Sequence, residues 1–244
     1  MNSDNVLTAY QKAAETDSFT MHNEFLKLLL EDVSPSGIER HYTFFNATDN
    51  ATLKRILGNG FLKRGQEGLL YLAEKLKTET DKLKKSNVIH LIGLSYNRQY
   101  LPIVAPFLTE EDEEVRYKAI IACGWLGDNE AIDLLTAHYT LETNTQLRAF
   151  TVSALRQIYF RHKETKDKIV EFVNQNIVNE TTDEVIAVMI VVLQDLTNVR
   201  YGLRENGSTG EISGEIWFEL RRNVQKTHDA AQLPILFDAN GFRL

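Results

Sequence analysis

The sequence predicts an all-α protein made of stacked helix pairs, a right-handed α-solenoid. Apolar residues recur at the three- and four-residue spacing of an amphipathic helix along most of the 244 residues, as in Leu69, Leu72 and Leu76. We find no convincing run of alternating apolar and polar residues bounded by turn signals, the pattern typical of a strand. Only 4 prolines and 13 glycines interrupt the chain, which favours long regular elements.

The amino-terminal third shows helical periodicity but matches the rest of the chain weakly. Residues 1–80 are therefore predicted to form a degenerate start of the solenoid and its cap. The spacing of apolar residues predicts helices over 5–15, 20–32, 36–47, 50–58 and 61–78.

An internal repeat follows over residues 81–200. Three segments that begin at Val115, Leu147 and Val185 carry apolar residues at matching positions, and a fourth copy covers 86–97. One core position is occupied in turn by Ile92, Cys123, Leu155 and Leu193, at intervals of about 31 to 38 residues. A helix pair of this length cannot bury its apolar surface alone, so stacking of neighbouring copies is expected.

A second amphipathic helix is predicted after each of the first three copies along the chain, over 99–108, 129–139 and 165–178. The last copy opens with Thr181-Thr-Asp-Glu184, in which a hydroxyl precedes a Glu by three residues. This is the sequence pattern of a capping box.

Two motifs resemble known repeats. Glu114-Val-Arg116 through Leu126-Gly-Asp128, and then Asn129 through Leu135, resemble the HEAT-like repeats that also occur in phycobiliprotein lyases. The resemblance covers roughly 84–200. It implies that Arg116 and Arg148 form a ladder by bonding to the Asp of an inter-helix turn, for which Asp128 is available.

Residues 201–244 resemble the closing segment of bacterial HEAT-like proteins. A glycine-rich stretch over 202–214 is expected to be flexible or a hairpin, and a helix bearing Trp217 follows it. The tail 233–244 is expected to fold back, because Ile235 and Phe237 should not stay exposed. We interpret 1–244 as a single domain.

Charge and composition limit the partner and the compartment. The chain has 27 Lys and Arg against 34 Asp and Glu, a net charge of −7, which opposes broad phosphate binding, so no nucleic acid is expected. No signal peptide is visible, no apolar stretch is long enough to span a bilayer, and Cys123 is the single cysteine. A cytoplasmic protein without membrane contact is expected.

The sequence lacks the common signatures of catalytic sites. The sequence has no phosphate-binding glycine loop, no nucleophile elbow and no His-Glu dipeptide, on which the two irons of a HEAT-repeat hydroxylase depend. Cys123 occupies a core position of the repeat, so a buried structural thiol is favoured over a reactive one. We predict a protein that is not an enzyme and has no cofactor or metal.

These observations favour a scaffold that binds a protein or peptide. The second helices are expected to line a concave face whose acidic residues suit a basic partner. An adaptor, a chaperone and an antitoxin-like or immunity-like neutraliser all fit. A HEAT-like DNA-repair glycosylase or a pigment-lyase-type enzyme is the alternative. The candidate residues on these helices are Glu130, Asp133, Asp167, Glu171 and Asn174.

Trp125 is a further candidate for partner binding. Its repeat position is held by Gln157 and Asp195 in the next two copies, so it faces away from the core. The indole is expected to be covered by a neighbouring element; if it is exposed, it is the best anchor for a partner.

Overall fold

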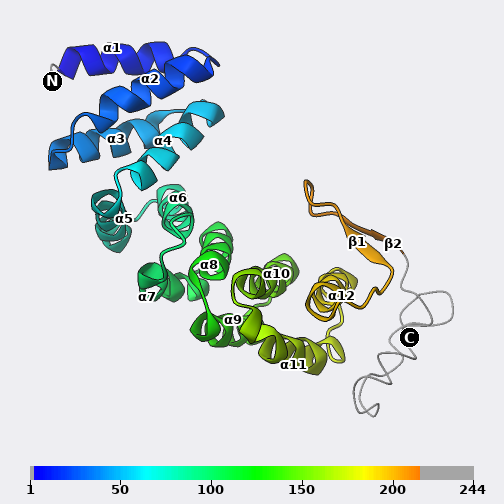
Figure 1. Cartoon of the computed structure of the whole chain (residues 1–244). Coiled ribbons are helices and arrows are strands. Elements are labelled where there is room, and N and C mark those ends of the chain that lie inside the picture. The colour runs from blue at the N-terminus through cyan, green and yellow to red at the C-terminus, as the bar shows by residue number, and fades with distance from the viewer. Residues whose placement is uncertain (1–2, 215–244) are drawn as a thin grey trace. The chain divides into compact units, whose positions relative to one another are not determined.

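The structure, a computed structural model, describes residues 3–214 (Figure 1). The chain divides between Ile103 and Val104 into two compact units. The helix expected around Trp217 and the tail 233–244 lie outside the described residues. We describe each unit by itself.

The first unit consists of α1 (Ser3–Ala14), α2 (Phe19–Leu30), α3 (Pro35–Ala47), α4 (Ala51–Lys63), α5 (Gln66–Thr78) and α6 (Lys82–Gly93), followed by the 3₁₀ turn η1 (Arg98–Tyr100). Each of the six α-helices packs against the next along the chain, and α2 also packs against α4. Ser18, Ser34, Asn50 and Asp81 each accept a backbone N–H with their side chains and so begin α2, α3, α4 and α6.

The predicted helices of the amino-terminal third are confirmed, with one boundary moved. The sequence placed a break near residue 59, whereas α4 continues to Lys63 and the chain turns at Gly65. Gly65 has φ of +64°, in the left-handed region that suits glycine.

A buried histidine joins three helices of the first unit. His41 in α3 has no exposed surface, and its Nε2 donates to the Leu57 carbonyl of α4 at 2.9 Å. Arg64, just after α4, donates from Nε to His41 Nδ1 at 3.1 Å and from Nη1 and Nη2 to the carbonyls of Asp32 and Leu29, at the end of α2. Burial, together with the Arg64 charge, lowers the pKa of His41 to about 3, so the ring is neutral in the folded protein.

The second unit contains the best-matched repeats. Its elements, beginning with a helix that straddles the division, are α7 (Leu101–Val104), η2 (Ala105–Thr109), α8 (Glu113–Leu126), α9 (Asn129–Leu141), α10 (Thr145–Arg161), η3 (Lys163–Thr165), α11 (Lys166–Ile177), α12 (Asp183–Thr197), β1 (Leu203–Glu205) and β2 (Ile212–Gly214).

Two local predictions for the repeats are wrong. The helix expected over 99–108 is broken into η1, α7 and η2, because Pro102 and Pro106 supply no backbone N–H. The capping box before α12 does not form: Thr182 is the N-cap, without a side-chain cap bond, and its hydroxyl accepts from Arg148 Nη2 at 3.3 Å.

The repeat helices of the second unit form two rows (Figure 1). In the first row α10 packs extensively against both α8 and α12, whereas α9 and α11 lie apart from one another in the second row. Helices on the inner side of a curved stack approach most closely, so α8, α10 and α12 make the inner row. The prediction that the second helices line the concave face is therefore wrong, because α9 and α11 form the outer row.

A β-hairpin follows α12, as predicted for 202–214. β1 and β2 are antiparallel, with Leu203 opposite Gly214 and Glu205 opposite Ile212. Among the described residues the remaining regular structure is helical, so the predicted all-α solenoid is confirmed.

Gly124 sets the close approach of α8 and α10. A Cβ built at this position would lie 3.0 Å from the Ala154 Cβ and 3.1 Å from the Ala154 Cα. We expect Gly124→Leu to lower the free energy of unfolding by about 1–3 kcal/mol through overpacking, as measured by urea denaturation. Gly207→Leu is the control, because a Cβ at Gly207 meets nothing within 4 Å. An equal effect of the two substitutions would contradict the close packing.

Candidate protein-binding surface

An arginine–carboxylate ladder holds successive repeats together. Arg116 of α8 donates from Nε to Glu142, just after α9, at 2.7 Å, and from Nη1 to the carbonyls of Glu110 and Glu111. Arg148 of α10 repeats the arrangement one copy later, with Glu180 as its carboxylate at 3.2 Å.

The predicted ladder is thus present with different partners. Asp128 does not receive these arginines in the bonds described; its side chain accepts the Glu130 N–H at 3.0 Å and caps α9. The acceptors are Glu142 and Glu180, which follow the outer helices.

The ladder carboxylates are ionised in spite of burial. Burial by itself raises the pKa of Glu142, but hydrogen bonds from Arg116 and from the Asn144 backbone outweigh it, and the net pKa is lowered. For Glu180, hydrogen bonds from Tyr139, the Thr182 backbone and Arg148 likewise outweigh burial and lower the pKa. The ladder arginines therefore serve structure rather than partner binding.

Cys123 lies in the core of α8. The thiol has no exposed surface, and burial raises its pKa to about 12. The predicted structural thiol agrees with this placement, because a protonated and inaccessible sulfur is a poor nucleophile.

The acidic candidates gather on the outer row. Glu130 and Asp133 lie on α9, and Asp167 and Glu171 lie on α11; all four are exposed, and Asn174 on α11 is half-buried.

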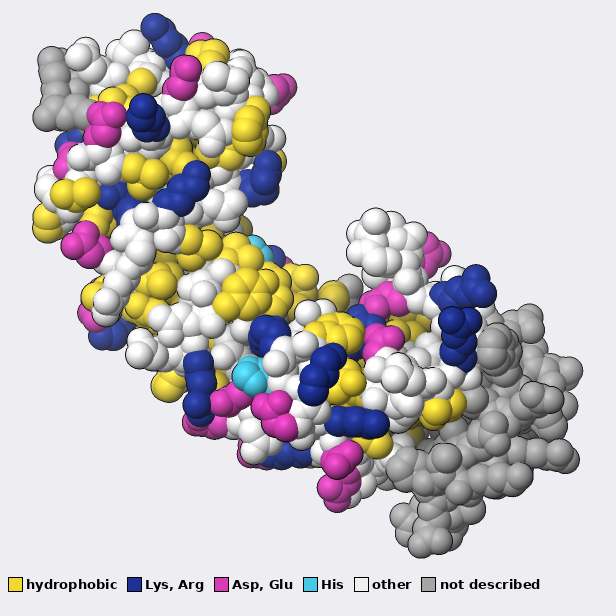
Figure 2. All heavy atoms as spheres, viewed as in Figure 1, with side chains coloured by type: hydrophobic (Ala, Val, Ile, Leu, Met, Phe, Trp, Pro, Cys, Tyr) yellow, Lys and Arg dark blue, Asp and Glu magenta, His cyan; other side chains and the backbone are white. Residues whose placement is uncertain are grey.

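Their surroundings are mixed in charge rather than acidic. Lys168 forms an ion pair with Asp133 at 2.7 Å, and Glu171 accepts from Gln175 at 3.1 Å. Figure 2 shows Lys and Arg side chains interspersed with Asp and Glu over α9 and α11.

The open face of the inner row carries aromatic side chains. We call this stripe the inner face. The Tyr117 and Phe150 rings meet across α8 and α10, with centroids 4.6 Å apart, and Lys118 lies 4.7 Å over the Tyr117 ring. The residues of the stripe on α8 and α10 are Tyr117, Lys118, Ile121, Trp125, Phe150, Ser153, Gln157 and Phe160.

Trp125 is half-buried, between the two alternatives considered from the sequence. Part of the indole is covered and part remains accessible. A ring that is already held by its surroundings loses little conformational freedom on binding, which suits an anchor residue.

A buried arginine fixes the hairpin to the inner row, and the sequence alone did not reveal it. Arg156 of α10 is 8% exposed and forms ion pairs with Asp195 of α12 at 3.1 Å and with Glu205 of β1 at 2.6 Å. Its repeat position is held by Gly124 and Gln194 in neighbouring copies. A charged arginine at a position that holds Gly124 in the preceding copy was a usable signal for a special role.

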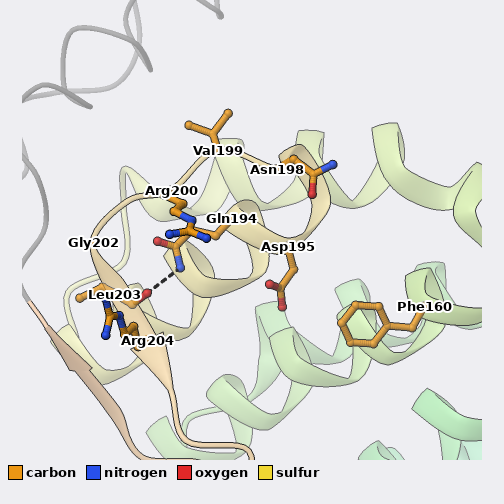
Figure 3. Close-up of a pocket in the computed structure, with 9 residues that line it drawn as sticks. All are labelled: Phe160, Gln194, Asp195, Asn198, Val199, Arg200, Gly202, Leu203 and Arg204. Carbon is orange, nitrogen blue, oxygen red and sulfur yellow. Dashed lines mark hydrogen bonds between the residues drawn. The ribbon is translucent and has the colours of Figure 1, made fainter.

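A pocket of about 540 Å³ opens beside this cluster, and we call it the loop pocket. Figure 3 shows Asp195 and Phe160 on one side, and Arg200 and Arg204, from the loop and β1, on the other. The lining residues are Phe160, Gln194, Asp195, Asn198, Val199, Arg200, Gly202, Leu203 and Arg204.

Comparison with known proteins identifies the repeat. Residues 69–156, from α5 into α10, match the family model of HEAT repeats. This part of the chain is similar to HEAT repeats. The finer resemblance to the phycobiliprotein-lyase type stays a prediction.

The chain was also compared with solved structures and with curated proteins. A crystal structure of an engineered protein is similar, with 16% sequence identity, a TM-score of 0.44 and coverage of 81% of this chain and 98% of that chain. No curated protein matches the chain.

Among residues 3–214, no helix is long and apolar enough to cross a bilayer. The same part of the chain contains no group of three or more His, Cys, Asp or Glu side chains placed to hold a metal ion.

Proposed function

We propose that the protein is a non-enzymatic cytoplasmic scaffold whose HEAT repeats bind a protein or peptide on the inner face. The observation that carries the proposal is the row of accessible aromatic side chains on α8 and α10, with Trp125 as the anchor. Aromatic residues dominate the energetic centres of protein interfaces, and HEAT repeats commonly serve as interaction scaffolds.

A partner with a basic surface fits the charge of the chain. The net charge of −7 attracts a basic protein at long range and speeds encounter, whereas the inner face supplies the short-range contacts. An adaptor, a chaperone and a neutraliser of a basic enzyme remain equally compatible with this arrangement.

The test compares the two rows of helices. The partner is first identified by affinity purification and mass spectrometry, and its affinity is then measured for purified variants. We expect Trp125→Ala to weaken binding about 30-fold or more, as for a hot-spot residue worth about 2 kcal/mol. The control combines Glu130→Gln with Glu171→Gln on the outer row and should change affinity less than about twofold. The reverse pattern would return the site to α9 and α11 and overturn the proposal.

A further inference from the structure

We propose that the loop pocket binds an acidic side chain of the partner, next to an apolar side chain that packs on Phe160. This inference rests on the proposed function. It adds a second contact site, which prefers an acidic group, although the partner as a whole is expected to have a basic surface. It concerns one local group, so it is compatible with a partner that is basic over its surface as a whole.

The two arginines of the loop pocket are free to bind a ligand. Arg200 and Arg204 are both exposed and line the pocket, and within residues 3–214 neither side chain has a hydrogen bond or an ion pair. Three other arginines of the second unit, Arg116, Arg148 and Arg156, each bind a carboxylate. A guanidinium binds a carboxylate through charge-assisted hydrogen bonds, and that is the group Arg200 and Arg204 lack.

The loop that carries Arg200 is held in place. Gln194 of α12 donates from Nε2 to the Leu203 carbonyl at 3.0 Å, and its Oε1 accepts the Tyr201 N–H at 2.6 Å (Figure 3 shows the first of these bonds). Asn198 ends α12 in the left-handed conformation, with φ of +58°. Tyr201 is buried, so the loop is anchored to the core between the exposed Arg200 and Arg204.

The wall of the loop pocket opposite the two arginines favours an apolar side chain next to the bound carboxylate. Phe160 is 47% exposed, and its ring extends the pocket toward α10. Asp195 also lines the pocket, and it forms an ion pair at 3.1 Å with Arg156, which it shares with Glu205. An incoming carboxylate therefore meets two unpaired cations and a carboxylate that is already paired.

The probe is a blocked dipeptide of a size that suits the pocket, acetyl-Phe-Glu-amide, with acetyl-Phe-Gln-amide as the matched neutral control. Both are titrated into the isotopically labelled full chain and followed by backbone NMR. We expect saturable shifts at residues 198–204 with the acidic peptide and about tenfold weaker binding with the neutral one. Arg200→Gln and Arg204→Gln should each lower the affinity for the acidic peptide by about tenfold, whereas Lys166→Gln on α11 should leave it unchanged.

Several outcomes overturn the inference. These are the absence of saturable shifts at 198–204, equal binding of the two peptides, and unchanged binding by the arginine variants. The failure of the proposed function is distinguishable, because Trp125→Ala tests it separately. If Trp125→Ala lowers the affinity for the native partner while Arg200→Gln and Arg204→Gln do not, the proposed scaffold function is supported and the proposed acidic contact is wrong.

Discussion

Replacing Arg116 by alanine is expected to lower the free energy of unfolding by about 3–5 kcal/mol, because it leaves the buried Glu142 without its counter-charge. The Glu142 side chain is 3% exposed and that of Arg116 is 14% exposed, so water cannot replace the lost partner easily. Denaturant unfolding followed by circular dichroism measures the effect.

The double variant Arg116→Met with Glu142→Gln is the control for this prediction. It removes both charges and should be less destabilised than Arg116→Ala, because no uncompensated charge remains buried. A loss below about 1 kcal/mol for Arg116→Ala would be typical of a surface ion pair and would contradict the structural role of the ladder.

Acidification below pH 6.5 is expected to destabilise the first unit through His41. The unfolded histidine titrates near 6.5, whereas the folded pKa is about 3. Between these two values the unfolded state binds a proton that the folded state does not. The contribution of His41 to the free energy of unfolding is therefore fully present above pH 6.5 and is lost as the pH falls below that value. The slope from this one group approaches about 1.4 kcal/mol per pH unit.

Urea denaturation at a series of pH values tests the contribution of His41. His41→Gln should be less stable at pH 7 and should lose most of the slope between pH 6 and 4. His162→Gln serves as the control, because His162 is only half-buried and contacts Glu164 near the surface. The same slope in His41→Gln and the unsubstituted chain would show that the pH dependence arises elsewhere.

Core positions and turns were predictable from the sequence because they follow from local patterns. The apolar period placed Val115, Cys123 and Leu126 inside α8, and all three are buried. The glycine-rich stretch placed the hairpin between Gly202 and Gly214. The repeat also indicated that Arg116 and Arg148 would play the same role in successive copies.

The location of the inner face was not predictable, because amphipathic periodicity identifies a buried face but not the direction in which a stack curves. Row assignment depends on the close packing of α8, α10 and α12, for which the Gly124–Ala154 contact is one cause. The ladder acceptors were missed for a similar reason: Glu142 and Glu180 lie in connections, where sequence spacing does not fix the path. Arg156 reaches partners 39 and 49 residues away, which only the folded chain brings together.

Oxidative footprinting of the protein with and without its partner tests the inner face most directly. Hydroxyl radicals modify accessible aromatic side chains, so the reactivity of Trp125, Tyr117 and Phe150 reports on the inner face. We predict that the partner protects these three residues and leaves Phe172 on α11 unchanged. Protection of Phe172 with unaltered reactivity at Trp125, Tyr117 and Phe150 would contradict binding at the inner row.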